Sequence, residues 1–318
     1  MGKTREIKKR IKAVGNIRRI TKTMQMIASS KFARAQKAAT ATKPFTEGVF
    51  ELVRQIADNL GGGAGGAGGE GGEISHPLIS GPSGVDAATT AAAKKVTLII
   101  TSDRGLCGPY NGSILRTAMA RFRSDPAAKA GEVEIAGRKG ASFLKFNNVA
   151  TSQQHTIGDK PEHAAIERLA QSYIERFVAG EIASVHVVYM RFISAGRQKP
   201  EVMQLLPLQP PPAAAAAGAG GAGGGGGGES RQPVQYEFSP AGPQLLDTLL
   251  PMAIKSMLMQ AVNDAIVSEH IARMVAMKSA TDNAGKMGKR LTRSYNRARQ
   301  AQITTELTEI ISGAAALE

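Results

Sequence analysis

The sequence predicts two long helices, one at each end of the chain, and a small α/β domain with a mostly parallel sheet between them. Apolar residues recur at helical spacing through residues 1–60 and again through residues 244–312, a pattern that favours extended helices. Between these segments, β-branched runs alternate with amphipathic stretches over residues 94–208, which is typical of an α/β domain.

In the N-terminal segment the apolar side chains advance by steps of 4, 3, 3, 3, 4 and 3 residues, close to the average of a heptad repeat. No proline occurs before Pro44. At about 1.5 Å per residue, a helix over residues 3–43 would be roughly 60 Å long. The stripe consists of Ile7, Ile11, Val14, Ile17, Ile20, Met24 and Ile27.

The C-terminal segment carries a second apolar stripe, and no proline follows Pro251. A continuous helix over residues 244–312 would be on the order of 100 Å long, too long for the inside of a single globular domain. Gly285 and Gly288 weaken this helix, and we expect them to permit a bend. The stripe consists of Leu249, Ala253, Met257, Ala261, Ile266, Ile271, Val275, Leu291, Tyr295, Ala298, Leu307 and Ile310.

The middle segment opens with a β-branched run at residues 95–101, which predicts a strand buried on both faces. Further strands are predicted at residues 132–136, 182–190 and 202–208, and helices at residues 111–123, 138–146 and 162–178. Strands that alternate with helices in this way predict one small α/β domain.

Two glycine-rich runs, Gly61–Gly72 and Pro211–Gly228, divide the chain, and each contains nine glycines. Such runs cannot bury enough surface to offset their ordering entropy, so we predict linkers or loops at both places. The predicted division is an N-terminal helix at residues 1–60, a Gly/Ala-rich linker at 61–93, the α/β domain at 94–210, a Gly-rich insertion at 211–232, and a segment at 233–318 that holds the C-terminal helix.

The chain is strongly basic, with 40 Lys and Arg against 26 Asp and Glu, a formal net charge of +14. This balance implies an acidic partner: nucleic acid, an anionic membrane surface or an acidic protein. Residues 1–37 hold 12 basic residues and one acid, and residues 273–299 hold eight and one. Ordinary solvated helices mix charges of both signs, so two helices of one sign indicate a shared task.

No run of 18 apolar residues and no signal-peptide core is present, so no membrane span is predicted.

The turn at residues 101–108 follows a strand and precedes a helix, which is where open α/β sheets place active sites. Cys107 is a candidate nucleophile there, with Asp103 and Arg104 as a polar pair. No histidine stands in a recognisable pairing with Cys107, and the glycines match no phosphate-binding loop, so a structural turn is favoured. The dispersed histidines give no metal-ligand spacing. The single cysteine excludes an internal disulfide and fits a reducing compartment.

Three classes of function remain open on composition and spacing. A nucleic-acid binder would place the basic helices on phosphates, although these helices contain few aromatic residues. An enzyme would work from the α/β domain, but a catalytic constellation is missing. A structural or mechanical protein would use the long helices themselves, and the composition favours this class without identifying it.

Four segments carry a resemblance to a known family. They are IRRITKTMQMIASSK at residues 17–31, DRGLCG at 103–108, ARMVAMKSATDNA at 272–284 and YNRARQAQITTELTEIISGA at 295–314. They closely resemble the gamma subunit of the rotary, F-type ATP synthase. The resemblance covers all of the chain except the two glycine-rich runs, and long matches at both ends in the right order make it highly specific.

The resemblance implies a left-handed antiparallel coiled coil of the two terminal helices, inserted into a ring of three alpha and three beta subunits. It implies that the α/β domain lies against the epsilon subunit and the membrane c ring. The implied function is a central rotor shaft that couples ion flow through the c ring to the conformational cycling of the catalytic beta subunits, for ATP synthesis or, in reverse, hydrolysis. The subunit itself would be non-catalytic, with no cofactor, metal, nucleic acid or direct membrane insertion. Its implied location is peripheral, on the cytoplasmic face of a bacterial inner membrane.

The resemblance also implies contact residues. Met24 corresponds to a methionine near the lower bearing of the shaft. Arg299, Gln300 and Thr304 correspond to a polar cluster that bonds to a beta-subunit loop. The remaining rotor–stator positions are Arg273 and Glu306, and the foot positions that touch the c-ring loops are Tyr236 and Glu237. The alternative for each residue is plain helix surface or packing within the coil.

Overall fold

The computed structural model of the 318-residue chain describes residues 2–61, 76–80, 93–159, 161–208 and 242–315. The predicted insertion at 211–232 and the foot residues Tyr236 and Glu237 lie outside these residues, as does most of the predicted linker at 61–93. The division into domains therefore stays a prediction. By contacts the chain forms two compact units, and each is described by itself. Unit 1 comprises residues 1–34, 106–108 and 269–318, and unit 2 comprises residues 35–105 and 109–268.

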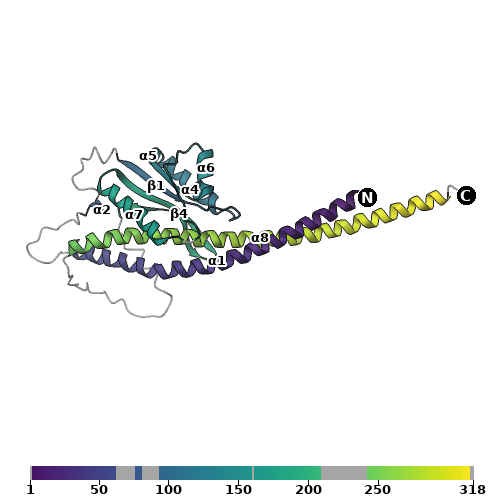
Figure 1. The fold of residues 1–318 in the computed structure, drawn as a ribbon, viewed down its shortest axis with the longest axis horizontal. Coiled ribbons are helices and arrows are strands. Elements are labelled where there is room, and N and C mark those ends of the chain that lie inside the picture. Colours follow the sequence, from purple (N-terminus) through teal and green to yellow (C-terminus); the bar gives the residue numbers. More distant parts are fainter. Residues whose placement is uncertain (1, 62–75, 81–92, 160, 209–241, 316–318) are drawn as a thin grey trace, which may run out of the picture. The chain divides into compact units, whose positions relative to one another are not determined.

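Two long helices, α1 (Gly2–Gly61) and α8 (Gly242–Ala315), begin and end the described chain (Figure 1). The prediction of long terminal helices is confirmed, but α1 does not end before Pro44. An interior proline removes one helical hydrogen bond and costs about 3 kcal/mol. Packing offsets this cost, because Thr46 and Val49 beyond the proline are buried. Likewise α8 remains one helix through Gly285 and Gly288.

The two helices run antiparallel in unit 1. Thr281 Oγ1 donates to Thr21 Oγ1 at 2.8 Å, and Thr4 Oγ1 donates to Gln302 Oε1 at 3.2 Å. In unit 2, Asn263 Nδ2 donates to Thr42 Oγ1 at 3.3 Å. Partners on α8 thus move toward its N-terminus as partners on α1 move toward its C-terminus, which is the antiparallel arrangement that the resemblance implied.

The residues that pack between the helices differ from the predicted N-terminal stripe. Ile17, Ile20 and Ile27 are each more than half exposed, whereas Thr21 and Ala28 are buried. Steps of seven residues from Ile7 lead to Val14, then to Thr21 and then to Ala28. The buried face therefore continues through small and polar residues, and the expectation that Ile17, Ile20 and Ile27 form the inner face is wrong. Small side chains let two helices approach closely, which apolar periodicity alone does not reveal.

Unit 2 contains a five-stranded sheet in the order β3-β2-β1-β4-β5. The pairs β3–β2, β2–β1 and β1–β4 are parallel and β4–β5 is antiparallel, which confirms a mostly parallel sheet. The strands are β1 (Lys94–Ile100), β2 (Glu132–Ala136), β3 (Gln153–His155), β4 (Ile182–Ser194) and β5 (Arg197–Leu206).

Two differences from the predicted strands concern the edges of the sheet. The short edge strand β3 was not predicted, because Gln153, Gln154 and His155 are polar and show no apolar alternation. On the other edge, β5 begins at Arg197 rather than near residue 202, since its first half is polar and contains Pro200. Edge strands tolerate both features, since one side of the strand needs no ladder bonds.

Helices cover both faces of the sheet (Figure 1). Val96, Leu98 and Ile100 of β1 belong to a buried apolar cluster that also includes residues of α7 (His163–Val178) and α8. Side chains alternate along a strand, so Thr97 and Ile99 lie on the opposite face. That face is covered by α4 (Tyr110–Ser124), α5 (Pro126–Ala130) and α6 (Arg138–Phe146). A short helix, α2 (Pro77–Ser80), packs near α7.

One 18-residue window in α8 is long and apolar enough, by composition, to cross a membrane, with a mean hydropathy of 1.3. This window is not an uninterrupted run of apolar residues. Of this window, 44% is buried inside the protein. Core helices of soluble proteins have the same length and composition, so these two features do not make α8 a membrane span.

Candidate functional surface

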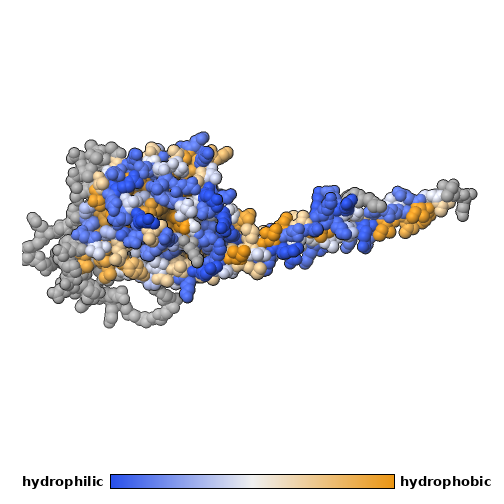
Figure 2. All heavy atoms as spheres, in the orientation of Figure 1, coloured by the Kyte–Doolittle hydropathy of each residue, from blue (hydrophilic) through white to orange (hydrophobic). Residues whose placement is uncertain are grey.

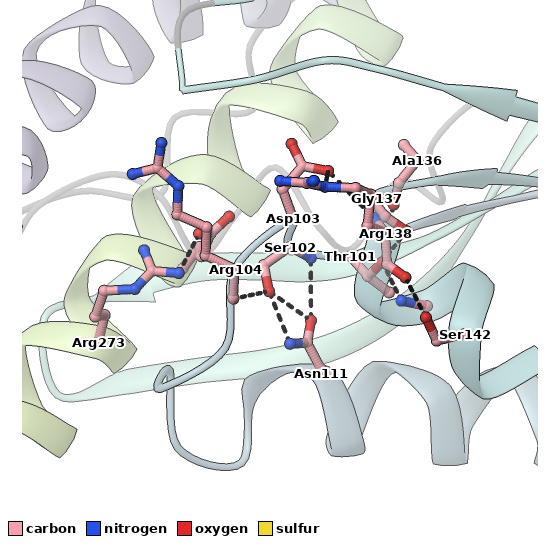
Figure 3. Close-up of polar contacts among 12 residues, drawn as sticks. Thr101, Ser102, Asp103, Arg104, Asn111, Ala136, Gly137, Arg138, Ser142 and Arg273 are labelled. Carbon is pink, nitrogen blue, oxygen red and sulfur yellow. Dashed lines mark hydrogen bonds and ion pairs between the residues drawn. The ribbon is translucent and has the colours of Figure 1, made fainter.

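The turn after β1 is held by hydrogen bonds within the protein (Figure 3). Thr101 Oγ1 donates to the Ala136 carbonyl at 2.9 Å and accepts from the Gly140 amide at 3.1 Å. Ser102 is tied to Asn111, which approaches both its amide and its hydroxyl. The side chains of this turn therefore bind the strand to the helices that follow it.

Asp103 and Cys107, the candidate catalytic residues of this turn, have structural surroundings. Asp103 Oδ1 accepts a hydrogen bond from the Arg138 amide at 3.1 Å, at the start of α6. A carboxylate at a helix N-terminus is stabilised by the helix dipole and satisfies a free amide. Cys107 is only 2% exposed, so its thiol is not presented to a substrate in solution. The interpretation of residues 101–108 as a structural turn agrees with both observations.

Two histidines of unit 2, His155 and His186, have surroundings set by the protein itself. His155 contacts buried Glu134 through Nε2 at 2.6 Å. Burial, with Arg121 and Lys95 nearby, lowers the pKa of His186 to about 4, so this imidazole is neutral at physiological pH. His163 is exposed at the start of α7, as expected of a surface residue.

Glu134 is the centre of a buried polar network that no pattern in the sequence predicts. Tyr173 Oη donates to Glu134 Oε2 at 2.5 Å, and Arg176 of the same helix bonds Glu132 at 2.7 Å. Burial and the neighbouring Glu134 raise the pKa of Tyr173 well above its ordinary value. The hydrogen bond from Arg176 lowers the pKa of Glu132. These contacts join β2 and β3 to α7, and their spacing along the chain shows no local pattern.

The polar residues expected to contact a stator lie on the exposed side of α8 or on its flank. Arg299, Gln300 and Thr304 are all exposed. Thr304 Oγ1 bonds the Gln300 carbonyl one turn earlier, and Glu306 accepts from Gln302 Nε2 at 2.8 Å. These three residues share a short stretch of helix surface that is open to a partner. Their role as contacts stays a prediction.

The other two rotor–stator positions are less exposed. Arg273 is half-buried and bonds Glu269 at 2.6 Å within its own helix. Met24 is also half-buried. It lies between the exposed Ile20 and Ile27 at helical spacing. The contact at Met24 therefore stays a prediction.

The end of α8 carries an exposed apolar stripe formed by Ile303, Leu307, Ile310 and Ile311. Gln302 lies opposite Thr4, and α1 begins at Gly2. The helix α8, however, continues to Ala315, so its last turns run past the start of α1. Figure 2 shows apolar surface along this end of the helix. The sequence placed Leu307 and Ile310 in the coil stripe, but these two residues are exposed.

Comparison with known proteins decides the family. The sequence profile described as ATP synthase matches residues 3–317. The ATP synthase gamma chain of Rhodopirellula baltica is 36% identical over 320 residues, with all of both chains covered. That of Leptospira biflexa is 38% identical over 320 residues, again with all of both chains covered. The chain belongs to the ATP synthase gamma chain family.

Solved structures with the same fold come from the ATP synthase central stalk. The rotor of the mitochondrial ATP synthase of Euglena gracilis, in rotational state 1, matches with a TM-score of 0.58 at 17% identity, covering 95% of this chain and 99% of that chain. The central stalk and c ring structure from Tetrahymena thermophila matches with a TM-score of 0.52 at 17% identity, covering 82% and 99%. The gamma chain fold of two long helices and an α/β domain is thus confirmed, as is the resemblance noted in the sequence.

Proposed function

We propose that this gamma chain is the central rotor shaft of an ATP synthase and couples ion flow through the c ring to conformational cycling of the catalytic beta subunits. The observation that carries the proposal is the outer end of α8. There an exposed apolar stripe follows a stretch of α8 that is rich in basic residues. An apolar stripe of this kind on a soluble helix indicates a surface that a partner covers. A sleeve formed by alpha and beta subunits would cover it on all sides.

The charge pattern of unit 1 suits a shaft that must turn inside its partners. Exposed ion pairs contribute only about 0–1 kcal/mol each, whereas a buried pair costs roughly 3–5 kcal/mol when it loses one partner. A diffuse positive surface facing acidic loops therefore attracts the partner without fixing a single angle. One charge crossing 100 mV releases about 2.3 kcal/mol, which exceeds the worth of one exposed pair. The paired helices supply stiffness.

The remaining parts of the proposal follow from the same role. The chain would be a non-catalytic subunit of a proton-translocating complex, able to support synthesis or, in reverse, hydrolysis of ATP. Its partners would be the alpha and beta ring, the epsilon subunit and the c ring. Its place would be the cytoplasmic face of a bacterial inner membrane. Buried Cys107 and the internally bonded turn support the absence of bond chemistry in this subunit.

Co-purification tests the proposal directly. The full chain, tagged and co-expressed with alpha, beta and epsilon subunits, is expected to retain all three in salt that releases non-specific polyanions. Retention on DNA, reversed by salt and without any of these subunits, would contradict it and favour a nucleic-acid binder.

A variant tests the polar residues near the end of α8. Changing Arg299 and Gln300 together to Ala is expected to impair coupled ATP synthesis while the circular dichroism of the chain stays unchanged, because both side chains are exposed. Arg293→Ala and Asn296→Ala, also exposed on α8, provide a matched control. Normal synthesis by the Arg299/Gln300 variant would remove these residues from the contact surface.

A further inference from the structure

Three neighbouring residues of α8 make polar contacts with the α/β part of unit 2. The Ala265 carbonyl accepts a hydrogen bond from Tyr110 Oη of α4 at 3.0 Å. Ser268 Oγ donates to the Met190 carbonyl of β4 at 3.3 Å. Asp264 accepts from the Phe192 amide of β4 and from Gln260 Nε2. At about 100° per residue, these three positions lie on one side of the helix.

These contacts are buried as well as directional. Tyr110, Ser268 and Asp264 are all among the buried residues, so water does not compete for their partners. Apolar packing resists separation of two elements but allows them to slide, whereas hydrogen bonds depend on direction. Three such bonds, made to two different elements, fix the rotation of α8 about its own axis relative to the sheet.

The helix α1 also packs within unit 2, where Ala39, Thr46 and Val49 are buried. Nine residues of α8 belong to the buried cluster shared with the sheet and α7, among them Leu250, Ile254 and Leu258. Ala35 of α1 also packs against this cluster and is partly buried. Asn263 Nδ2 of α8 donates a hydrogen bond to Thr42 Oγ1 of α1, and Lys43 of α1 interacts electrostatically with Asp264.

We propose that hydrogen bonds at Asp264, Ala265 and Ser268 fix the α/β domain to α8, so that torque passes between the domain and the shaft through α8. The proposal rests on the rotor function proposed above. It assigns Tyr110, Asp264 and Ser268 as positioning residues for coupling. Their loss lets the domain slip under load without stopping the chemistry in the beta subunits.

The test compares variants in the complete complex, reconstituted into vesicles. The double variant Tyr110→Phe with Ser268→Ala removes both hydroxyl groups that donate these hydrogen bonds and adds no bulk. We expect protons pumped per ATP hydrolysed to fall on the order of fivefold or more against an imposed gradient, the equilibrium effect of losing two ordinary hydrogen bonds. With an uncoupler present, ATP hydrolysis is expected to match the unchanged complex. Thr42→Ala, which removes the hydroxyl on α1, is the matched control and should leave the ratio unchanged.

A second pair of variants separates coupling from folding. Asp264→Asn keeps an acceptor for the Phe192 amide and should pump normally, whereas Asp264→Ala should slip under load. Equal ratios of protons pumped per ATP in the unchanged complex and in the variants would overturn the proposal. A loss of ATP hydrolysis that is the same with and without the imposed gradient would also overturn it. If the unchanged chain fails to assemble or to couple at all, the rotor function itself fails instead.

Discussion

Two segments of the same helix, α8, show how one chain builds an anchor and a working surface. The anchored segment, Leu246–Ser268, places Leu250, Ile254 and Leu258 in the buried cluster of unit 2. The outer segment, Ile271–Ala315, exposes most of its large apolar residues, including Ile303 and Leu307. Both segments show helical apolar spacing, so spacing alone does not distinguish them. The difference lies in whether the chain itself supplies the covering surface.

The largest expected effect comes from truncating a leucine in each segment. Leu258→Ala should destabilise the chain by about 2–5 kcal/mol, because Leu258 is fully buried and its loss leaves a cavity. Leu307→Ala, at a position that is 54% exposed, should change the free energy of unfolding by no more than about 0.5 kcal/mol. Urea unfolding of the purified chain measures both. Similar losses in the two variants would break the distinction between the segments.

A pH-dependent effect should be confined to the anchored segment. Burial raises the pKa of Asp264 from 3.8 to about 6, so the folded chain takes up a proton more readily than the unfolded chain. The stability that Asp264 contributes is therefore fully present below pH 3.8 and is lost as the pH rises through 6. Asp264→Asn should gain about 1–3 kcal/mol at pH 8 and progressively less below pH 6.

Thermal unfolding at several pH values measures this difference. Asp282→Asn, in the outer segment, is the control because Asp282 is exposed. If the difference in stability between Asp264→Asn and the unchanged chain did not vary with pH, burial of the ionised carboxylate would not be destabilising.

A smaller effect is expected between the two helices of unit 1. Thr281→Ala removes the 2.8 Å hydrogen bond to Thr21 at a buried position, and should cost about 0.5–1.5 kcal/mol. Thr308→Ala is the matched control, since Thr308 is exposed and its hydroxyl bonds the Thr304 carbonyl of the same helix. Amide hydrogen exchange of α1 and α8 in unit 1 would report the loss. Unchanged exchange near Thr281 would argue that helix backbone contacts alone hold the pair.

The smallest effect has the opposite sign. A β-carbon at Gly288 would meet nothing within 4 Å, so Gly288→Ala should stabilise α8 by about 0.5–1 kcal/mol. Its helix is continuous through this position, which makes the glycine unnecessary for the fold. Destabilisation, measured by hydrogen exchange in the outer segment, would instead indicate that the glycine serves a local bend.

The sequence predicted elements that depend on local patterns and missed those that depend on contacts between residues far apart in the chain. The β-branched run of β1 and the amphipathic pattern of α7 are local signals, and both elements were predicted. The strand β3 was missed because pairing with β2, not its own Gln-Gln-His sequence, makes it a strand. The network of Glu134, Tyr173 and Arg176 joins residues far apart in sequence, and no local pattern signals it.

The candidate surface was predicted only in part. The resemblance supplied Arg299, Gln300 and Thr304, and the structure finds all three exposed. The exposed stripe at the end of α8 was not foreseen, because the periodicity of Leu307 and Ile310 is the same whether a helix faces its own chain or a partner. The exposure of these two side chains shows that the chain itself does not cover them.

The sequence by itself determined the two long helices, the α/β pattern between them, the strong positive charge and the family. Each of these depends on composition or on spacing within one segment. Only the tertiary structure decided which residues line the coil, how the edges of the sheet are completed, and that α8 holds the core of unit 2 while its outer end stays uncovered. Burial depends on what lies opposite a residue in space, and a periodic pattern describes a helix face without naming its neighbour.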